Sequence, residues 1–233
     1  MTGFKEIYEE ERKRLVMRLI EEGYVRSQKV ARAMLKVPRE CFVPTKYARY
    51  AYEDSPLPTL CGQTISAPHM CALMCEELDL KKGEIVLEIG TGSGYHAALC
   101  AEIVAPQGSK NPGHVYTLEI FWQLVCFARR NLERAGYLDR VSVFNADGSF
   151  TLPFRINFDK ILVTASAPRI PETLIKRLKV GGRMVIPIGG TFIQELIVVD
   201  KVAEDKYITK SRGGCVFVKL LGKHGFKDWY NFI

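Results

Sequence analysis

The stretch Glu84-Ile85-Val86-Leu87-Glu88-Ile89-Gly90-Thr91-Gly92-Ser93-Gly94-Tyr95 decides the fold of this chain. A short apolar run ends in an acidic residue and three glycines at alternate positions, which predicts a buried strand that enters a tight turn. We expect a helix over 95–104 to follow, with free backbone N–H groups facing a ligand. This order is typical of a doubly wound α/β sheet that binds a nucleotide-like cofactor at the end of its first strand.

The spacing of the glycines indicates which cofactor this is. Gly90, Gly92 and Gly94 form G-x-G-x-G, whereas dinucleotide-binding turns use G-x-G-x-x-G, and the chain has no phosphate-binding Gly-Lys-Ser/Thr. The acidic Glu88 before the turn suits a ligand without a pyrophosphate. S-adenosylmethionine is such a ligand, because it carries a cationic sulfonium and an ammonium group. The alternative is a glycine-rich turn that binds nothing.

Two further strands are predicted to end in polar groups beside this turn. Residues 115–119 end in Glu119, whose carboxylate can accept both ribose hydroxyls. Residues 141–148 end in Asp147 and Gly148. The aspartate can accept a hydrogen bond from the adenine amino group, and the glycine lets the ring lie close. Each acid alone is more often a surface or capping residue, but three strands in series favour a cofactor site.

Composition favours a globular, cytoplasmic protein. The 233 residues are 47% hydrophobic, enough for one large α/β domain. No apolar run approaches the ~18 residues of a membrane span, and the charged first 14 residues lack the apolar region of a signal peptide. The net charge of +7 permits nucleic-acid binding, but the basic residues alternate with acids, as on solvated helix faces. We expect a monomer.

The seven cysteines are scattered along the chain, without a C-x-x-C pair. With only four histidines beside them, they give no zinc pattern, so we expect no metal site. Most should be small buried thiols, and whether any of them form disulfides stays open.

The chain is predicted to form an N-terminal helical extension, residues 1–60, packed on a catalytic domain, residues 61–233, that is a single structural unit. Helices over 4–22 and 28–36 make up the extension, with Ser27 as N-cap of the second. The later apolar runs 194–200 and 215–220 have no helix between them, so we expect two antiparallel strands there. Together with strands expected near 84–90, 114–120, 141–147, 159–165 and 183–189, they give a seven-stranded mixed sheet with helices on both faces.

A second motif lies just before the predicted sheet. Gln63-Thr64-Ile65-Ser66-Ala67-Pro68-His69-Met70 reads as a loop that leads into a helix with Pro68 in its first turn, and Ser66 on its own reads as an N-cap. Taken with residues 84–95, this segment resembles the signature of the protein-L-isoaspartate O-methyltransferases. Further similarity, to archaeal members in particular, covers most of the chain from about Arg26 to Trp229.

The resemblance implies a Rossmann-like class I S-adenosylmethionine-dependent methyltransferase. It would methylate the free α-carboxylate of L-isoaspartyl residues in damaged proteins and peptides and release S-adenosylhomocysteine; D-aspartyl residues stay open as substrates. It further implies that Ser66 is the active-site residue, acting on the carboxylate rather than as a nucleophile. The residues expected at the cofactor are Thr64, Ile65, Glu88, Gly90, Thr91, Gly92, Ser93, Gly94, Glu119, Ile120, Asp147 and Gly148.

The chain departs from the family pattern at Thr151, Leu152, Ile156, Asn157 and Lys219, which we expect toward the rim of the site, where they would alter substrate range. Two other functions stay open. A tRNA methyltransferase would use the basic surface, although the chain lacks the Asn/Asp-Pro-Pro-aromatic motif of base-amine methylation. A non-catalytic methyltransferase-like binding module would have little reason to keep the glycine motif and both strand-end acids.

Overall fold

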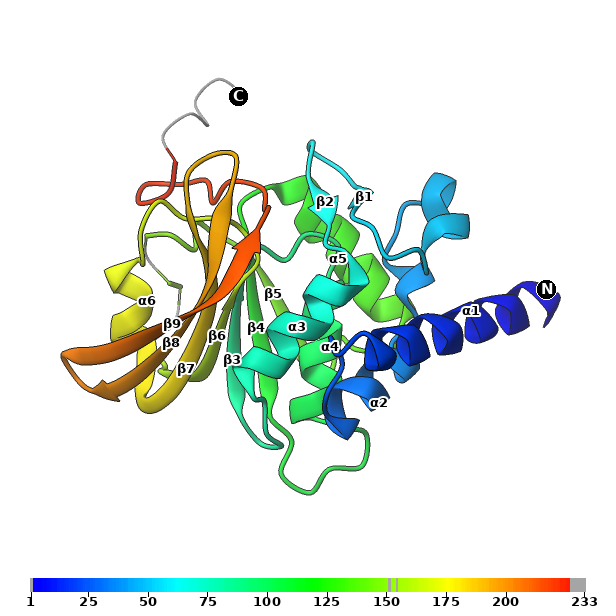
Figure 1. Ribbon diagram of the computed structural model, residues 1–233, viewed down its shortest axis with the longest axis horizontal. Coiled ribbons are helices and arrows are strands. Elements are labelled where there is room, and N and C mark those ends of the chain that lie inside the picture. The colour runs from blue at the N-terminus through cyan, green and yellow to red at the C-terminus, as the bar shows by residue number, and fades with distance from the viewer. Residues whose placement is uncertain (1, 151, 154, 227–233) are drawn as a thin grey trace.

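A seven-stranded mixed sheet forms the centre of the computed structural model, which describes residues 2–150, 152–153 and 155–226 (Figure 1). The strand order is β5-β4-β3-β6-β7-β8-β9, in which the first five strands are parallel, β8 pairs antiparallel with β7, and β9 pairs antiparallel with β8. The strands are β3 (Ile85–Ile89), β4 (His114–Glu119), β5 (Val141–Asn145), β6 (Phe158–Val163), β7 (Leu178–Gly189), β8 (Gln194–Ala203) and β9 (Lys206–Cys215).

Helices cover both faces of the sheet, as the sequence predicts. Alternate residues of a strand point to opposite faces, and Val86 packs in one buried cluster while Leu87 packs in the other. The first cluster takes in α3 (Pro68–Leu78), α4 (Tyr95–Val104) and α5 (Trp122–Arg134), and the second takes in α6 (Glu172–Arg177). Figure 1 shows the same division, with α6 alone on its side of the sheet.

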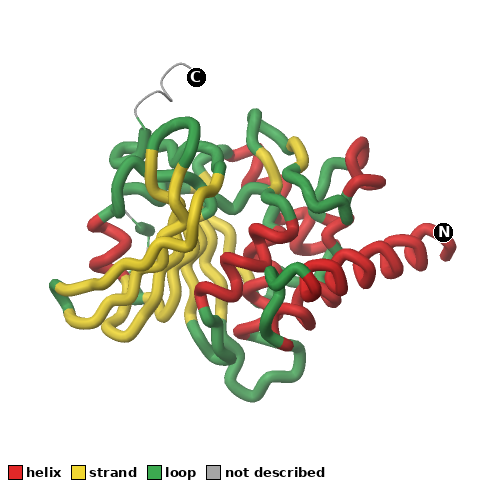
Figure 2. The backbone as a smooth tube through the Cα atoms, viewed as in Figure 1, coloured by secondary structure: helices red, strands yellow, loops and turns green. Residues whose placement is uncertain are grey.

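The N-terminal helices continue the larger helical layer away from the sheet (Figure 2). They are α1 (Thr2–Glu21) and α2 (Gln28–Lys36), and Ser27 caps α2 as predicted, accepting a hydrogen bond from the Val30 N–H. From α1, Leu15 and Leu19 enter the first cluster, whereas Ile20 is exposed. The division at residue 60 stays a prediction, and β1 (Leu57–Pro58) pairs with β2 (Thr64–Ile65) across it.

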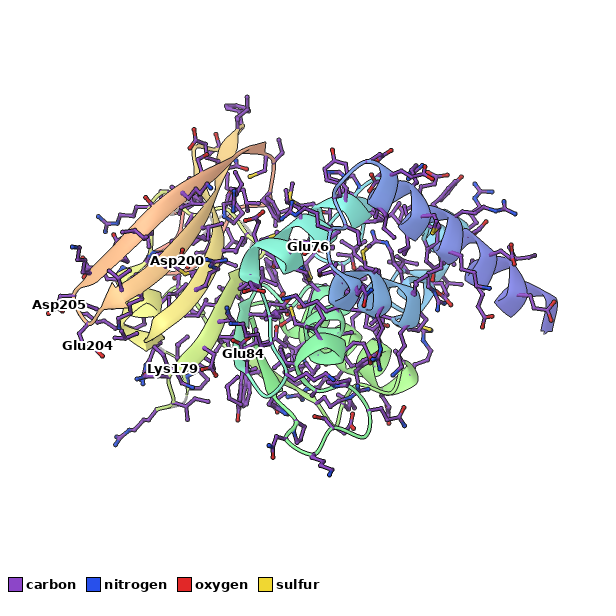
Figure 3. The ribbon with its side chains drawn as sticks, turned by 60° about the horizontal axis from the view of Figure 1, so that its bottom comes forward. Glu76, Glu84, Lys179, Asp200, Glu204 and Asp205 are labelled. Atoms are coloured by element: carbon purple, nitrogen blue, oxygen red, sulfur yellow. The ribbon has the colours of Figure 1, made fainter. Side chains whose placement is uncertain are left out.

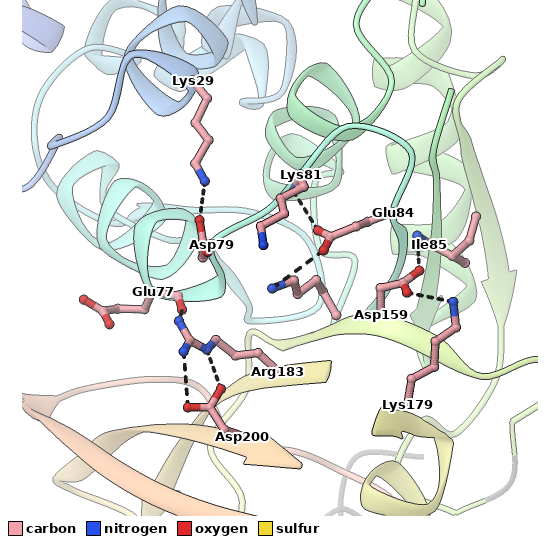
Figure 4. A network of polar contacts seen from close by, with 11 residues as sticks. Lys29, Glu77, Asp79, Lys81, Glu84, Ile85, Asp159, Lys179, Arg183 and Asp200 are labelled. Atoms are coloured by element: carbon pink, nitrogen blue, oxygen red, sulfur yellow. Dashed lines mark hydrogen bonds and ion pairs between the residues drawn. The ribbon is translucent and has the colours of Figure 1, made fainter. Parts of the chain in front are cut away.

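Ion pairs hold the edge of the sheet where the parallel strands begin. Figure 4 draws the pair between Lys29 and Asp79, and Figure 3 labels other charged side chains in this part of the molecule. Glu77, at the end of α3, pairs through one carboxylate oxygen with Arg26 at 2.7 Å and through the other with Arg212 of β9 at 2.6 Å. Lys29 of α2 contacts Asp79 at 2.5 Å, next to this pair. The helical extension, α3 and the last strand are therefore joined at one carboxylate.

The last strand was predicted in the wrong place. Its expected range was 215–220, but β9 spans Lys206–Cys215. Nine of its ten residues are exposed, so it lacks the alternating apolar pattern that reveals a half-buried strand. The apolar run after it instead crosses the carboxyl ends of the strands, where the Val218 carbonyl accepts a hydrogen bond from the Ser166 N–H at 2.7 Å and Leu220 is buried.

Candidate active site

A cavity that is open to solvent lies at the carboxyl ends of the parallel strands. This is the edge at which open α/β sheets bind ligands. Its walls come from six segments far apart in sequence: 63–66, 89–93 with 95–96, 118–121, 146 with 148, 164–165 and 218–221, and from Cys71.

The glycine turn forms one wall of this cavity. Gly90, Gly92 and Gly94 all have positive φ angles, as the predicted tight turn requires. A Cβ on Gly92 would meet nothing within 4 Å, so the backbone there has open space beside it. Gly148 differs, because a Cβ would come within 2.7 Å of the Ile89 side chain. The close approach at Gly148 is therefore to the protein itself, whereas Gly92 leaves room for a ligand.

Glu119 joins the end of β4 to the glycine turn. Its side chain is buried at the cavity, where one carboxylate oxygen accepts a hydrogen bond from the Gly92 N–H at 2.9 Å and the other from the Phe121 N–H at 3.1 Å. Burial raises the pKa of Glu119, and these two N–H groups oppose that rise. Each carboxylate oxygen has a second lone pair, so Glu119 can still accept hydrogen bonds from a ligand.

Glu88 lies behind the cavity wall and is not among the lining residues. The side chain is fully buried, and burial raises its pKa to about 8, so it is mostly neutral at pH 7. One oxygen accepts from the Thr117 hydroxyl at 2.5 Å, and Thr117 in turn shares a hydrogen bond of 2.7 Å with Thr91 in the cavity wall. Contact between Glu88 and the cofactor stays a prediction; in this structure Glu88 reaches the cavity only through the two threonines.

Asp147 and Gly94 also lie outside the lining residues, although their neighbours line the cavity. One oxygen of Asp147 accepts hydrogen bonds from the Ser149 N–H and hydroxyl, and the other accepts from the Lys223 N–H at 2.8 Å. The carboxylate therefore holds the segment after residue 221 against the end of β5. The predicted hydrogen bond from adenine to Asp147 would have to share these oxygens.

Ser66 lies between β2 and α3 and lines the same cavity as the glycine turn. The N-cap of α3 is Ala67, without a side-chain cap, so the reading of Ser66 as a helix cap is wrong. The Ser66 carbonyl accepts a hydrogen bond from the buried guanidinium of Arg39 at 2.9 Å. Within the described chain, the Ser66 hydroxyl makes no hydrogen bond, so it can serve a ligand.

The beginning of α3 is fixed by Asp54. Its carboxylate accepts a hydrogen bond from the His69 N–H at 2.8 Å and lies 3.0 Å from the His69 ring nitrogen Nδ1. The ring of Tyr24 packs against the His69 ring at 5.1 Å between centroids. These contacts hold the Ser66 loop in place. In the described residues no hydrogen bond joins His69 to Ser66, so the three side chains do not form a nucleophilic triad.

The remaining predicted residues, Thr64, Ile65, Thr91, Ser93 and Ile120, all line the cavity. Sequence reasoning missed three other parts of the wall. Tyr95 and His96 are in the first turn of α4, where helix phase after the glycine turn could have indicated them. Thr164 and Ala165 follow β6 at the same edge of the sheet. Residues 218–221 come from the chain that returns after β9, and of these only Lys219 was expected near the site, from its departure from the family pattern.

The expected rim position of the altered residues is right only for Lys219, which lines the cavity. Leu152 is buried in the second core cluster. Ile156 and Asn157 precede the start of β6, at the opposite end of that strand from the cavity. Six strand residues separate the two ends, about 20 Å. Thr151 and Trp229 lie outside the described residues.

The cavity offers a ligand open space beside the Gly92 backbone and hydrogen-bond acceptors at the end of β4. The glycine turn is not a phosphate-binding loop. These properties match S-adenosylmethionine, and with the sheet order they place the chain among the class I methyltransferases that depend on it. Within that class, the chain belongs to the protein-L-isoaspartate(D-aspartate) O-methyltransferase family, whose model matches residues 10–225.

Relatives from several organisms agree with this assignment. The protein-L-isoaspartate O-methyltransferase of Hyperthermus butylicus is 54% identical over 230 residues, which cover 98% of this chain and 95% of that protein. The Methanopyrus kandleri protein of the same name is 49% identical and covers 98% of this chain and 99% of its own. A Plasmodium falciparum crystal structure named for this enzyme, in complex with S-adenosyl-L-homocysteine, matches with a TM-score of 0.81 at 30% identity, over 90% of this chain and 98% of its own. The family resemblance in the sequence is thereby confirmed.

Proposed function

We propose that this protein repairs damaged proteins by methylating the free α-carboxylate of L-isoaspartyl residues, with Ser66 as the catalytic residue. The observation that supports this proposal is that the first three residues of the family's Thr-Ile-Ser-Ala-Pro-His-Met segment, 64–66, line the same cavity as the glycine turn. D-aspartyl residues, which the family name includes, are a second substrate to test. The methyl ester then closes spontaneously to a succinimide, which hydrolyses partly to normal aspartate.

The reaction asks little of acid–base chemistry. S-adenosylmethionine, when bound, supplies an activated methyl group on a cationic sulfur, and the substrate carboxylate is already ionised. What remains for the protein is orientation and removal of water, which can contribute several kcal/mol. Gly92 gives the cofactor room, Glu119 accepts hydrogen bonds from its ribose, and the Ser66 hydroxyl orients the carboxylate. Val218 and Leu220 close the wall beside it with apolar groups.

We also propose that the protein acts in the cytoplasm as a monomer. All seven cysteines are free thiols, which agrees with a reducing compartment. In the part of the chain that the structure describes, no helix is long and apolar enough to cross a membrane. Light scattering on a size-exclusion column tests the monomer directly.

Methylation assays with three acceptors test the function. With labelled S-adenosylmethionine, an isoaspartyl peptide should be methylated, whereas the same peptide with normal aspartate and bulk tRNA should not. Ser66→Ala should lower kcat by at least ten-fold and leave S-adenosylhomocysteine affinity within two-fold, because the hydroxyl acts on the carboxylate. Ser109→Ala, in the loop before β4 at the other end of the sheet, is the matched control. Equal methylation of both peptides, or tRNA as the better acceptor, would overturn the repair function.

A further inference from the structure

Two buried side chains beside Ser66 have nitrogens that nothing in the described protein satisfies. The Nη1 atom of Arg39 and both ring nitrogens of His96 are buried without a hydrogen-bond partner. Buried polar groups almost always have partners, and each exception calls for an explanation. Three such nitrogens in one neighbourhood, next to the cavity, therefore point to a group that the protein alone does not supply.

Arg39 is a buried cation without a carboxylate. The residue is 0% exposed, and its other guanidinium nitrogens donate to the Ala51 carbonyl at 2.8 Å and the Ser66 carbonyl at 2.9 Å. The guanidinium lies 4.8 Å from the centre of the Tyr95 ring. Among the described residues it forms no ion pair, although buried charges are normally paired. Arg39 thus places an uncompensated positive charge directly behind the Ser66 loop.

His96 lines the cavity, although both of its ring nitrogens are buried. It is the second residue of α4 and is only 6% exposed. Burial, together with the charge of Arg39, lowers its pKa to about 4, so the ring is neutral at pH 7 and has one N–H donor and one acceptor. The Cys71 backbone opposes this shift, and more strongly than the charge of Arg39 adds to it, although neither ring nitrogen has a partner in hydrogen-bond geometry. The positive end of the α4 dipole lies at the same place.

We propose that His96 and Arg39 form a carboxylate-binding subsite at the Ser66 end of the cavity. Because both ring nitrogens are buried in this structure, the His96 ring turns when the carboxylate binds, which brings an N–H to the cavity to donate a hydrogen bond. Arg39 supplies the compensating charge from behind the wall. His96 is a binding residue in this arrangement, and Arg39 is a positioning residue that holds the Ser66 loop. Two carboxylates could occupy this subsite: that of the substrate and the α-carboxylate of the cofactor. For the substrate carboxylate, the inference rests on the proposed function.

Binding measurements with two ligands separate these sources. S-adenosylhomocysteine has the carboxylate, whereas 5′-methylthioadenosine has the same adenosine and thioether without it. If the subsite holds the cofactor, His96→Leu should raise the Kd of S-adenosylhomocysteine by at least ten-fold and leave that of 5′-methylthioadenosine unchanged. If it holds the substrate, both Kd values should stay constant while KM for the isoaspartyl peptide rises at least ten-fold. In either case His96→Gln, which keeps an N–H donor, should recover much of the loss.

His114→Leu is the matched control, because His114 lies at the start of β4, away from the cavity, with a Ser142 hydroxyl 2.9 Å from its Nε2 atom. It should leave both Kd values and KM at wild-type level. The subsite is refuted if His96→Leu changes nothing, or if it weakens both ligands equally, which would indicate only a loss of cavity shape. A wild-type protein that ignores isoaspartyl peptides would overturn the proposed function alone, and the two-ligand comparison would still decide the subsite for the cofactor.

Nitrogen NMR of the histidine rings keeps the test valid if His96→Leu does not fold. If the subsite holds the cofactor, the His96 ring signals of the wild-type protein should shift on addition of S-adenosylhomocysteine but not of 5′-methylthioadenosine. If it holds the substrate, they should shift only when the isoaspartyl peptide is added to the complex. The chain has four histidines, so His96→Gln assigns the signal. Ring signals that respond identically to both ligands and ignore the peptide would overturn the proposal.

Discussion

The Glu119 carboxylate accepts a hydrogen bond from the Gly92 N–H at 2.9 Å, so the acid at the end of the second strand holds the glycine turn at the end of the first. This hydrogen bond gives Glu119 one role, to fix the turn, and we propose a second, to offer acceptors to the ribose. Glu119→Ala removes charge-assisted hydrogen bonds worth about 1.5–3 kcal/mol, and S-adenosylhomocysteine affinity should fall by roughly one to two orders of magnitude.

A ligand without the 2′-hydroxyl separates those two roles of Glu119. Wild-type protein should bind 2′-deoxy-S-adenosylhomocysteine more weakly than S-adenosylhomocysteine, whereas Glu119→Ala should bind the two ligands about equally. Titration calorimetry measures both differences. If the variant keeps the full preference for the 2′-hydroxyl, Glu119 acts on the turn alone.

Gly92→Ala should abolish most cofactor binding without unfolding the protein. The backbone at Gly92 has φ of +54° with open space beside it, so a methyl group there enters the volume left for the ligand. Gly136→Ala is a close control, because Gly136 has φ of +76° and equally open surroundings but lies after α5, away from the cavity. Both variants should lose about 1–2 kcal/mol of stability from the left-handed backbone. Only Gly92→Ala should bind S-adenosylhomocysteine at least ten-fold more weakly; equal binding by the two variants would contradict this.

Glu88 should make the protein less stable as pH rises. Its pKa is raised to about 8 in the folded state from 4.5, so the folded protein keeps a proton that the unfolded chain loses. The stabilisation is fully present below pH 4.5 and disappears as pH rises to 8, by an amount on the order of a few kcal/mol.

Glu88→Gln tests this linkage, because glutamine is neutral at every pH. The drop in melting temperature between pH 5 and pH 8.5 should become smaller in the variant than in wild type, and the variant should be the more stable protein at the higher pH. The same scan on Glu133→Gln, an exposed position on α5, accounts for the substitution itself. Identical pH profiles for wild type and Glu88→Gln would show that Glu88 is ionised in the folded state.

Glu77 should matter more to stability than any exposed ion pair. Its side chain is 5% exposed and bonds two arginines that come from the N-terminal extension and from β9. The two arginines are partly exposed, so water can solvate them when the carboxylate is lost. Glu77→Gln should therefore lower the free energy of unfolding, measured with urea, by about 1.5–3 kcal/mol. Glu10→Gln breaks only the exposed pair with Arg14 at 3.9 Å and should cost less than about 1 kcal/mol. Equal losses would mean that the buried position of Glu77 contributes nothing.

The sequence predicted those parts of the fold that carry strong local patterns. The glycine turn allowed both β3 and α4 to be predicted. Helix α4 spans the expected residues 95–104 because the turn marks where it begins. The last strand was misplaced because β9 is an exposed edge with mostly polar residues, and its apolar neighbours serve the cavity wall instead. A hydrophobic pattern indicates which residues are buried, not which residues pair in a sheet. Here the strand is β9, whereas the apolar residues that follow it line the cavity.

The site was predicted where a motif supplies the residue and missed where only tertiary structure does. Gly92, Glu119 and Ser66 stand in motifs and all line the cavity. Arg39 carries no such signal, because a lone arginine in a proline-rich segment reads as a surface residue. Its contact with the Ser66 carbonyl joins residues 27 positions apart and exists only in the folded chain. Glu88 is the opposite case: the sequence identifies it as part of the motif but does not indicate that its side chain is buried behind the cavity wall.

The charged edge strand β9 has a consequence for the surroundings in which such a protein works. An exposed edge with unpaired backbone groups can recruit strands from other chains and start aggregation. Lys206, Lys210 and Arg212 lie along β9, so an identical strand added in register with it would bring like charges together. A repair enzyme meets partly unfolded proteins, whose loose strands seek partners. Charged side chains, lysine above all, also blunt a sheet edge toward other chains, so we expect strands of damaged proteins to pair poorly with β9.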